Sequence, residues 1–274
     1  MEQFHDGHHV RLRSYVLDTY LHADHDGEGV SLRRRRASMK QAWAVHLHHG
    51  DDGTLYVLLH SAAYGRYLAP TDAHGCRVAQ RDHDQPQAET IRWQAVRNGP
   101  EGDILLRHLG ADRDRYRFLR ANMRYFHRYN SVIVDGFENV SNMMQWVVEP
   151  IPPRQGVPDL PGPIRAGLSV LMLRRALAAS RTIRFVRAND DDGLFAEEDW
   201  ATFQFRRRFV YHLRNELATR VGVPDLIMCV RAGLYGRPTP FVVNLPRHGH
   251  TIEIVVVIAG TPASAQLRHP DVDA

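Results

Sequence analysis

The first half of the sequence states one pattern three times, and this repetition constrains the fold more than any other feature. The segments VRLRS, VLLHS and ILLRH begin at Val10, Val57 and Ile104, so successive copies start 47 residues apart. A Gly- or polar-rich hairpin follows each start, as in TYLHADHDGEGVSL, and such turn residues between short alternating runs are typical of a β-hairpin. Internal repeats of this length indicate that one small structural unit is used three times.

A tryptophan marks the end of each copy. Trp43, Trp93 and Trp146 lie in AWAVHL, IRWQAV and MQWVVEP, which are 50 and 53 residues apart at the tryptophan. The chain has four tryptophans, so three of the four share one position in the repeat. The pattern therefore predicts that these three rings have equivalent places in the core.

Apolar residues alternate within each unit, and a period of two indicates strands rather than helices. The first unit contains four such runs, at 10–14, 19–23, 30–32 and 42–47. A unit this small cannot bury its apolar face alone, but three around an axis close a barrel and remove its edges. We therefore predict a β-trefoil over residues 1–151. The predicted inward side chains are Val10, Leu12, Leu21, Ala23, Val30, Leu32, Trp43, Val45, Val57, Leu59, Leu68, Cys76, Val78, Trp93, Ile104, Leu106, Leu119, Ala121, Val132, Val134 and Trp146.

The second half of the chain follows a proline-rich segment. Residues 150–163 hold six of the fifteen prolines, which join neither a sheet nor a helix interior, so we predict a semi-rigid linker over 152–180. We expect few backbone hydrogen bonds across this linker, and we expect each half to fold alone. The apolar end of the linker, from Leu168, is either a short helix or an extended tether.

In residues 181–274, apolar residues follow a strand period in some segments and a helix period in one. Strands are predicted at 182–188, 201–208, 226–233, 240–246 and 251–260, and a helix at 210–222 that ends at Gly222. This order predicts a small α+β domain, best described as a ubiquitin-like (β-grasp) roll with a short C-terminal tail. The last strand is apolar enough to be central in the sheet. The tail reads LRHPDVDA and lacks the Gly-Gly end of a conjugated modifier, so we expect a fixed interaction module that docks through its sheet face.

Both halves together resemble a plant family that has long been filed as a domain of unknown function and is often labelled fascin-like or actin cross-linking. The resemblance rests on HHVRLRSYVLDTYLHADHDGEGVSL, YVLLHSAAYGRYLA and NVSNMMQWVVEPIPP in the first half. In the second half it rests on IRFVRAND, EEDWATFQFRRRFVYHLRNELATRVG and IEIVVVIAGTPASAQLRHP. It implies a fascin-like trefoil with its associated ubiquitin-like domain, a non-catalytic binding function, and F-actin or another acidic protein surface as the partner.

Two other functions stay open. A protein scaffold in plant signalling or defence, which binds other proteins through the ubiquitin-like domain, is the first alternative. A carbohydrate-binding trefoil is the second, because Gln41-Ala42-Trp43 matches the Gln-x-Trp of ricin-type lectins, although Trp93 and Trp146 lack that glutamine spacing. We find no nucleophile elbow and no Gly-rich phosphate loop, so we predict neither an enzyme nor a cofactor.

The run from Arg33 to Arg36 is the densest positive charge in the sequence. With Lys40, the chain's one lysine, it is our candidate partner-binding site for an acidic surface, and Ser38 beside it is a candidate phosphorylation site. Such a run also matches a nuclear-import signal. The alternative is an ordinary solvated loop.

The remaining composition favours a protein of the cytoplasm or nucleus. No apolar run is long enough to span a membrane, and the net charge of +4 does not demand nucleic acid as a partner, so we expect neither. Seventeen histidines include His46 and His48 on one strand face, but no carboxylate or thiolate at ligand spacing completes a metal site. Cys76 and Cys229 are predicted to be buried thiols.

Overall fold

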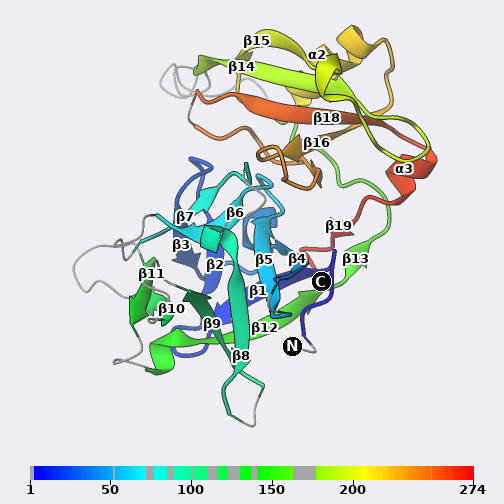
Figure 1. Cartoon of the computed structure of the whole chain (residues 1–274). Helices are drawn as coiled ribbons and strands as arrows, with labels where there is room; N and C mark the ends of the chain where they lie inside the picture. Colours follow the sequence, from blue (N-terminus) through cyan, green and yellow to red (C-terminus); the bar gives the residue numbers. More distant parts are fainter. Residues whose placement is uncertain are drawn as a thin grey trace.

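The computed structural model describes residues 3–51, 53–71, 77–84, 89–99, 102–109, 116–122, 130–136, 141–162, 177–247 and 249–274. The first half forms a single sheet of twelve strands (Figure 1). The strands are β1 His9–Ser14, β2 Tyr20–Ala23, β3 Val30–Arg33, β4 Trp43–His49, β5 Leu55–Ser61, β6 Tyr67–Pro70, β7 Val78–Arg81, β8 Trp93–Arg97, β9 Ile104–Leu109, β10 Tyr116–Asn122, β11 Asn130–Gly136 and β12 Gln145–Ile151.

Six of these strands close a barrel. β1 pairs with β4, β4 with β5, β5 with β8, β8 with β9, β9 with β12, and β12 returns to β1, all antiparallel. The other six strands form three hairpins, β2–β3, β6–β7 and β10–β11, each joined to the barrel by its first strand. The hairpins contact one another through β3–β11 and through bridges from Gly29 to Ala79 and from Arg77 to Ile133. This threefold arrangement is the predicted β-trefoil.

The three tryptophans occupy equivalent core positions. Each ring is fully buried, and each indole N–H donates to the carbonyl of the hairpin leucine in its own lobe. The donor–acceptor distances are 3.2 Å for Trp43 to Leu21, 2.8 Å for Trp93 to Leu68 and 2.9 Å for Trp146 to Leu119. All predicted inward side chains that the structure describes are buried, while Cys76 lies outside the described residues.

The second half is the predicted ubiquitin-like roll. Its sheet has the order β15-β14-β18-β16-β17, with β14 parallel to β18, so β18 is central as expected. Helix α2 buries Val210, Leu213 and Leu217 and ends at Gly222, whose φ of 75° suits glycine. The elements are β14 Leu177–Arg187, β15 Ala201–Arg207, α2 Val210–Val221, β16 Leu226–Arg231, β17 Thr239–Pro240, β18 Ile252–Ile258 and α3 Pro262–Ala265.

Two expectations for this domain are wrong. The strand predicted at 240–246 shrinks to β17, Thr239–Pro240, because the chain leaves the sheet so that the amide of Leu245 donates to the carbonyl of Arg208 at 2.9 Å. The sheet face opposite α2 is not an open docking surface. Ile227, Cys229 and Val255 on that face are covered by Phe195, Trp200, Ala263 and Leu267.

The segment after the trefoil is more ordered than a plain linker. Its first residues form β13, Pro153–Arg154, which pairs with β19, His269–Pro270, from the C-terminal tail. β14 begins at Leu177, four residues before the predicted start of the second domain. Most of the intervening apolar stretch lies outside the described residues. Figure 1 shows the two domains stacked, with β13 and β19 side by side at one edge.

Candidate functional site

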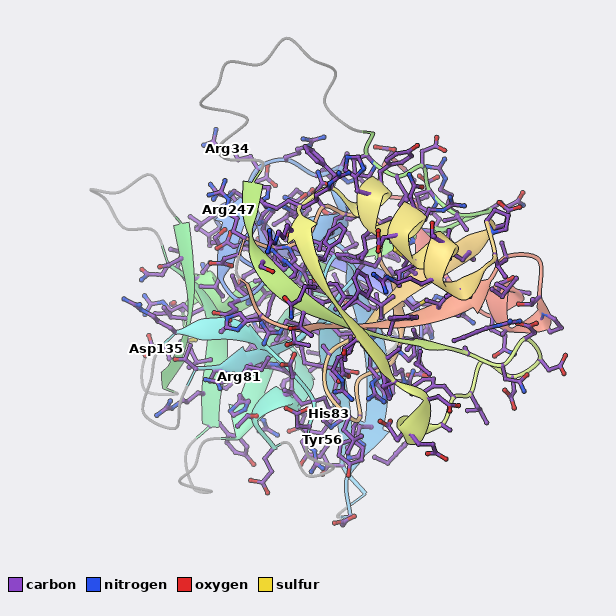
Figure 2. The ribbon with its side chains drawn as sticks, turned by 90° about the horizontal axis from the view of Figure 1, so that it is seen from above. Arg34, Tyr56, Arg81, His83, Asp135 and Arg247 are labelled. Carbon is purple, nitrogen blue, oxygen red and sulfur yellow. The ribbon has the colours of Figure 1, made fainter. Side chains whose placement is uncertain are left out.

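The predicted arginine run begins at Arg33, the half-buried last residue of β3, and continues into the loop before the 3-10 turn at Met39–Gln41. Arg34, Arg35 and Arg36 are exposed, and Figure 2 places Arg34 at the outer edge of the molecule. Arg36 lies 3.5 Å from a carboxylate oxygen of Glu149. Ser38 has a structural role, since its hydroxyl accepts from the amide of Lys40 at 3.3 Å and caps the turn.

Lys40 does not extend the exposed arginine surface. Its ammonium contacts Nδ1 of His25 and lies 5.8 Å from the centre of the Tyr64 ring. Burial, and then the nearby charge of Arg208, lower the pKa of Lys40 to about 8. The sequence could not place Lys40 correctly, because Arg208 belongs to the other domain.

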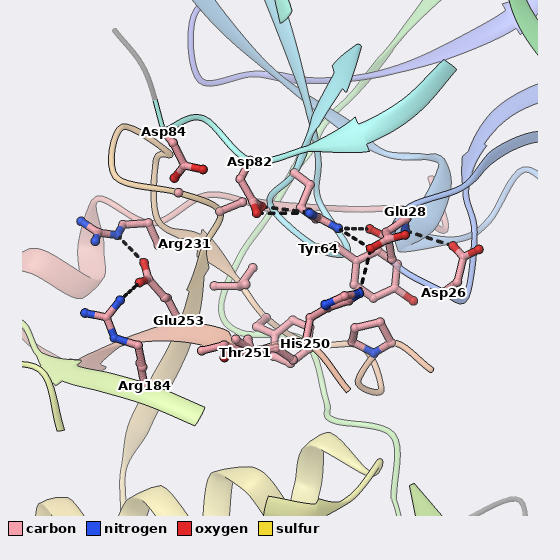
Figure 3. Close-up of a pocket in the computed structure, with 18 residues that line it drawn as sticks. Asp26, Glu28, Tyr64, Asp82, Asp84, Arg184, Arg231, His250, Thr251 and Glu253 are labelled. Carbon is pink, nitrogen blue, oxygen red and sulfur yellow. Dashed lines mark hydrogen bonds and ion pairs between the residues drawn. The ribbon is translucent and has the colours of Figure 1, made fainter. Parts of the chain in front are cut away.

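A cleft of about 580 Å³ lies between the two domains (Figure 3). The trefoil contributes the β2–β3 turn, Tyr64, Arg66 and the segment after β7, while the ubiquitin-like domain contributes β14, β16 and β18. Its floor is apolar and includes Val230, Phe241 and Ile252. The walls are charged, so a ligand here would meet an apolar base and a polar rim.

The trefoil wall is built by a tight turn and an ion-pair cluster. Oδ1 of Asp26 accepts from the amides of Glu28 and Gly29 at 3.0 and 2.7 Å, which fixes the turn between β2 and β3. Arg66 donates to both carboxylate oxygens of Asp82, at 2.9 and 3.2 Å, and lies 3.7 Å from Glu28. These contacts hold the acidic side chains in place at the mouth of the cleft.

The opposite wall centres on Glu253 of β18. One of its oxygens accepts from Arg184 and the other from Nε of Arg231, at 3.2 Å for the second. Arg231 also donates to Glu197 at 2.7 Å and stacks 4.9 Å from the ring of Trp200. A single carboxylate therefore ties two arginines to the sheet.

Acidic side chains outnumber basic ones in the cleft. Five carboxylates line it against three arginines, so the cleft carries negative charge before histidine is considered. Asp26 and Asp84 each use Oδ1 on backbone amides, and the described part of the chain gives their second oxygens no partner. The lining contains no serine, cysteine or lysine that would act as a nucleophile. The carboxylates are Asp26, Glu28, Asp82, Asp84 and Glu253; the arginines are Arg66, Arg184 and Arg231.

Sequence reasoning missed this cleft, although one signal was present. The tripeptide Asp-His-Asp occurs at 24–26 and again at 82–84, and both copies reach the domain junction. The second copy bonds the other domain directly, since the amide of His83 donates to the carbonyl of Ala232 at 2.9 Å.

The histidines and the lectin-like motif are mainly structural. His46 and His60 pack around Tyr67, and burial lowers the pKa of His46 to about 4. Within the described residues, no group of three or more His, Cys, Asp or Glu side chains is placed to hold a metal ion. Gln41 and Trp43 are fully buried, so the Gln-x-Trp of the first lobe faces the core instead of a ligand.

Comparison with known families identifies the chain. A family model described as "Beta-trefoil domain of unknown function (DUF569)" matches residues 1–149, and one described as "DUF569 associated ubiquitin-like domain" matches residues 179–257. The chain belongs to the DUF569 family. Among curated proteins, none matches the sequence.

Solved structures match about half of this chain. An SDF2-like protein from Arabidopsis thaliana is 15% identical, with a TM-score of 0.42, over 53% of this chain and 93% of its own. The designed threefold-symmetric protein ThreeFoil is 17% identical, with a TM-score of 0.39, over 52% and 97%. A ricin B-like lectin from Macrolepiota procera, in complex with lactose, is 15% identical, with a TM-score of 0.40, over 53% and 96%.

Within the described part of this DUF569 protein, no helix is long and apolar enough to cross a bilayer. Cys229 is buried, as predicted, and burial raises the pKa of its thiol to about 12.

Proposed function

We propose that this DUF569 protein is a non-catalytic binding protein whose interdomain cleft receives a cationic side chain from a protein partner. The observation that carries the proposal is the excess of carboxylates over arginines, five against three, in one cleft that both domains build. A lysine or arginine of the partner would enter the cleft and lay its methylene groups on the apolar floor. A charge-assisted hydrogen bond to the available oxygen of Asp26 or of Asp84, which lie at opposite ends of the cleft (Figure 3), would hold it.

This role agrees with the scaffold function that the sequence leaves open. Both domains must be present for the cleft to exist, because Asp84 comes from the trefoil and Glu253 from the ubiquitin-like domain. The contact between Asp84 and the amide of Leu234, at 3.3 Å, ties the site to the junction itself. Binding would therefore also stabilise the packing of the two domains.

Calorimetric titration of the full chain with short peptides tests the proposal. An acetylated tetralysine peptide should bind more tightly than tetraglutamate. The double variant Asp26→Asn, Asp84→Asn should weaken tetralysine binding about three- to tenfold, as expected for two partly exposed charge pairs. Asp225→Asn, an exposed carboxylate outside the cleft, is the matched control. Equal affinity of all three proteins would contradict the proposal, and binding on a glycan array instead would favour the carbohydrate alternative.

The arginine loop supports a second candidate function, binding to F-actin or another acidic protein surface. Arg34 and Arg35 are exposed, and neither forms an ion pair with a described carboxylate. Co-sedimentation with F-actin across a salt series tests this candidate, because exposed charges act through terms that salt screens.

A further inference from the structure

A second group of charged residues lies at the domain junction, next to Tyr64 and Pro246, which also line the cleft. Arg181 comes from β14, Arg208 follows β15, Arg247 follows Pro246, and Lys40 reaches across from the trefoil. The backbone holds them together: the amide of Arg247 donates to the carbonyl of His25 at 3.0 Å, and that of Leu245 donates to Arg208. We call Lys40, Arg181, Arg208 and Arg247 the junction cations.

Arg181 is buried without the partners a guanidinium needs. The residue is 1% exposed, and only Nη2 has a hydrogen bond, to the carbonyl of Pro246 at 2.8 Å. Its Nε and Nη1, together with Nε of Arg208, are buried without a partner among the described residues. Buried charged donors are normally paired, so three unmatched donors at one place point to a missing acceptor.

The positive charges at this place are poorly compensated. Burial, and then the charge of Arg208, lower the pKa of Arg181 to about 10, and burial and Arg247 lower the pKa of Arg208. The carboxylates of Asp24 and Asp26 oppose the fall in the pKa of Lys40, but no carboxylate of the described residues acts on the pKa of Arg181 or Arg208.

We infer that the junction cations form a binding site for a phosphate group of a small soluble ligand. Guanidinium groups match phosphate oxygens in pairs, and Arg181 and Arg208 together offer three donors that have no acceptor. Arg247 and His25 are exposed and form the entrance, while Arg181 is the buried base. Figure 2 shows Arg247 at the same edge of the molecule as Arg34, away from His83.

Phosphate at this site would join the two domains. Lys40 and His25 belong to the trefoil, and the three arginines belong to the ubiquitin-like domain, so one anion would neutralise repulsion across the junction. The junction cations share no residue with the lining of the acidic cleft and carry the opposite charge.

Thermal melts and calorimetric titrations of the full chain test this site, with inorganic phosphate and pyrophosphate added at constant ionic strength. Both anions should raise the melting temperature, and pyrophosphate should do so more. Arg208→Gln should weaken pyrophosphate binding at least about tenfold, the loss expected for one charge-assisted contact. Arg206→Gln, an exposed neighbour on β15, should bind within about twofold of the wild type.

The variant Arg181→Met distinguishes loss of the binding site from loss of the fold. Without ligand it should melt at or above the wild-type temperature, because it removes a buried and incompletely paired charge, yet it should lose the response to pyrophosphate. No response of the wild type to either anion, or equal losses in Arg208→Gln and Arg206→Gln, would overturn the inference. Binding to phosphatidic acid vesicles without a response to soluble pyrophosphate would also overturn it, because the ligand would then be a lipid.

Discussion

The guanidinium of Arg11, a fully buried residue of β1, donates through Nη2 to the carbonyl of Val272 at 2.6 Å. Its other two donors are buried without a partner in the described part of the chain. The tail that follows the ubiquitin-like domain therefore supplies a hydrogen-bond acceptor to a buried charge of the first domain, beside the β13–β19 pair.

Removing residues 269–274 should destabilise the trefoil by about 1–3 kcal/mol, because the guanidinium of Arg11 loses the carbonyl that accepts its hydrogen bond. The free energy of unfolding in urea measures the effect. In an Arg11→Met background the same truncation should cost much less, and equal costs in both backgrounds would show that the contact is irrelevant. The fragment 1–151, which the sequence predicts to fold alone, should for this reason be less stable than the trefoil of the full chain.

Trp93→Ala should lower the free energy of unfolding by about 3–5 kcal/mol, because the ring is fully buried and its N–H is bonded to Leu68. Chemical denaturation followed by circular dichroism measures this loss. A loss below about 1 kcal/mol, with the trefoil signal intact, would show that the ring is not part of the core.

The trefoil could be predicted from the sequence because its repeat is local and periodic. Alternation and the tryptophan spacing place each inward side chain without knowledge of the partner strand, and the ubiquitin-like domain follows from similar local patterns. The junction was not readable, because it depends on which surfaces meet. Asp84 accepts a hydrogen bond from the amide of Leu234, and the charge of Arg208 lowers the pKa of Lys40; each pair is separated by more than half the sequence. No periodicity connects such pairs.

Gly233→Ala should weaken the packing of the two domains against each other. Gly233 has a φ of 88°, and an added Cβ would lie 2.6 Å from Oδ1 of Asp84 and 2.7 Å from the backbone of His83. Gly260→Ala is the matched control, because its φ of 81° imposes similar backbone strain in open space. Gly233→Ala should therefore cost about 1–3 kcal/mol more than the control in chemical denaturation. If Gly233→Ala and Gly260→Ala lower the free energy of unfolding equally, then the junction accommodates the added methyl group without loss of packing.

Acid should weaken the fold through its buried histidines. Burial holds the pKa of His60 well below 6.5, and Nδ1 of His60 lies 3.2 Å from Thr239 across the junction. His9 and His46, with pKa values lowered to about 4, lie close to it. The unfolded chain takes up protons below about pH 6.5 and the folded chain does not. Stability is therefore complete above about pH 6.5 and falls between there and about pH 4.

His60→Asn should reduce this slope by about 1.4 kcal/mol per pH unit, the value for one proton. Melts across this pH range measure the slope, and His49→Asn, at an exposed histidine of β4, serves as the control. An unchanged slope in His60→Asn would show that this imidazole does not control the acid response.

Changing Arg33, Arg34, Arg35 and Arg36 together to Ala should weaken binding to F-actin or another polyanion roughly tenfold or more. Each exposed charge contributes about 0.2–1 kcal/mol, and the salt dependence should flatten with the loss of charge. The melting temperature should stay near the wild-type value, because Arg34 and Arg35 are exposed and the contact of Arg36 with Glu149 is partly exposed.

The double variant Arg34→Ala, Arg35→Ala tests whether binding depends on these two arginines or only on the net charge of the protein. It should weaken binding about three- to tenfold, whereas Arg206→Ala, Arg207→Ala removes the same charge from β15 and should not. Ser38→Asp tests phosphorylation better than Ser38→Glu, because aspartate can keep the cap on Lys40 while adding negative charge. It should weaken polyanion binding less than the double arginine variant. If the two double variants lose affinity equally, the loop is an ordinary solvated turn, and the binding face lies elsewhere, with the junction cations the next positive surface to test.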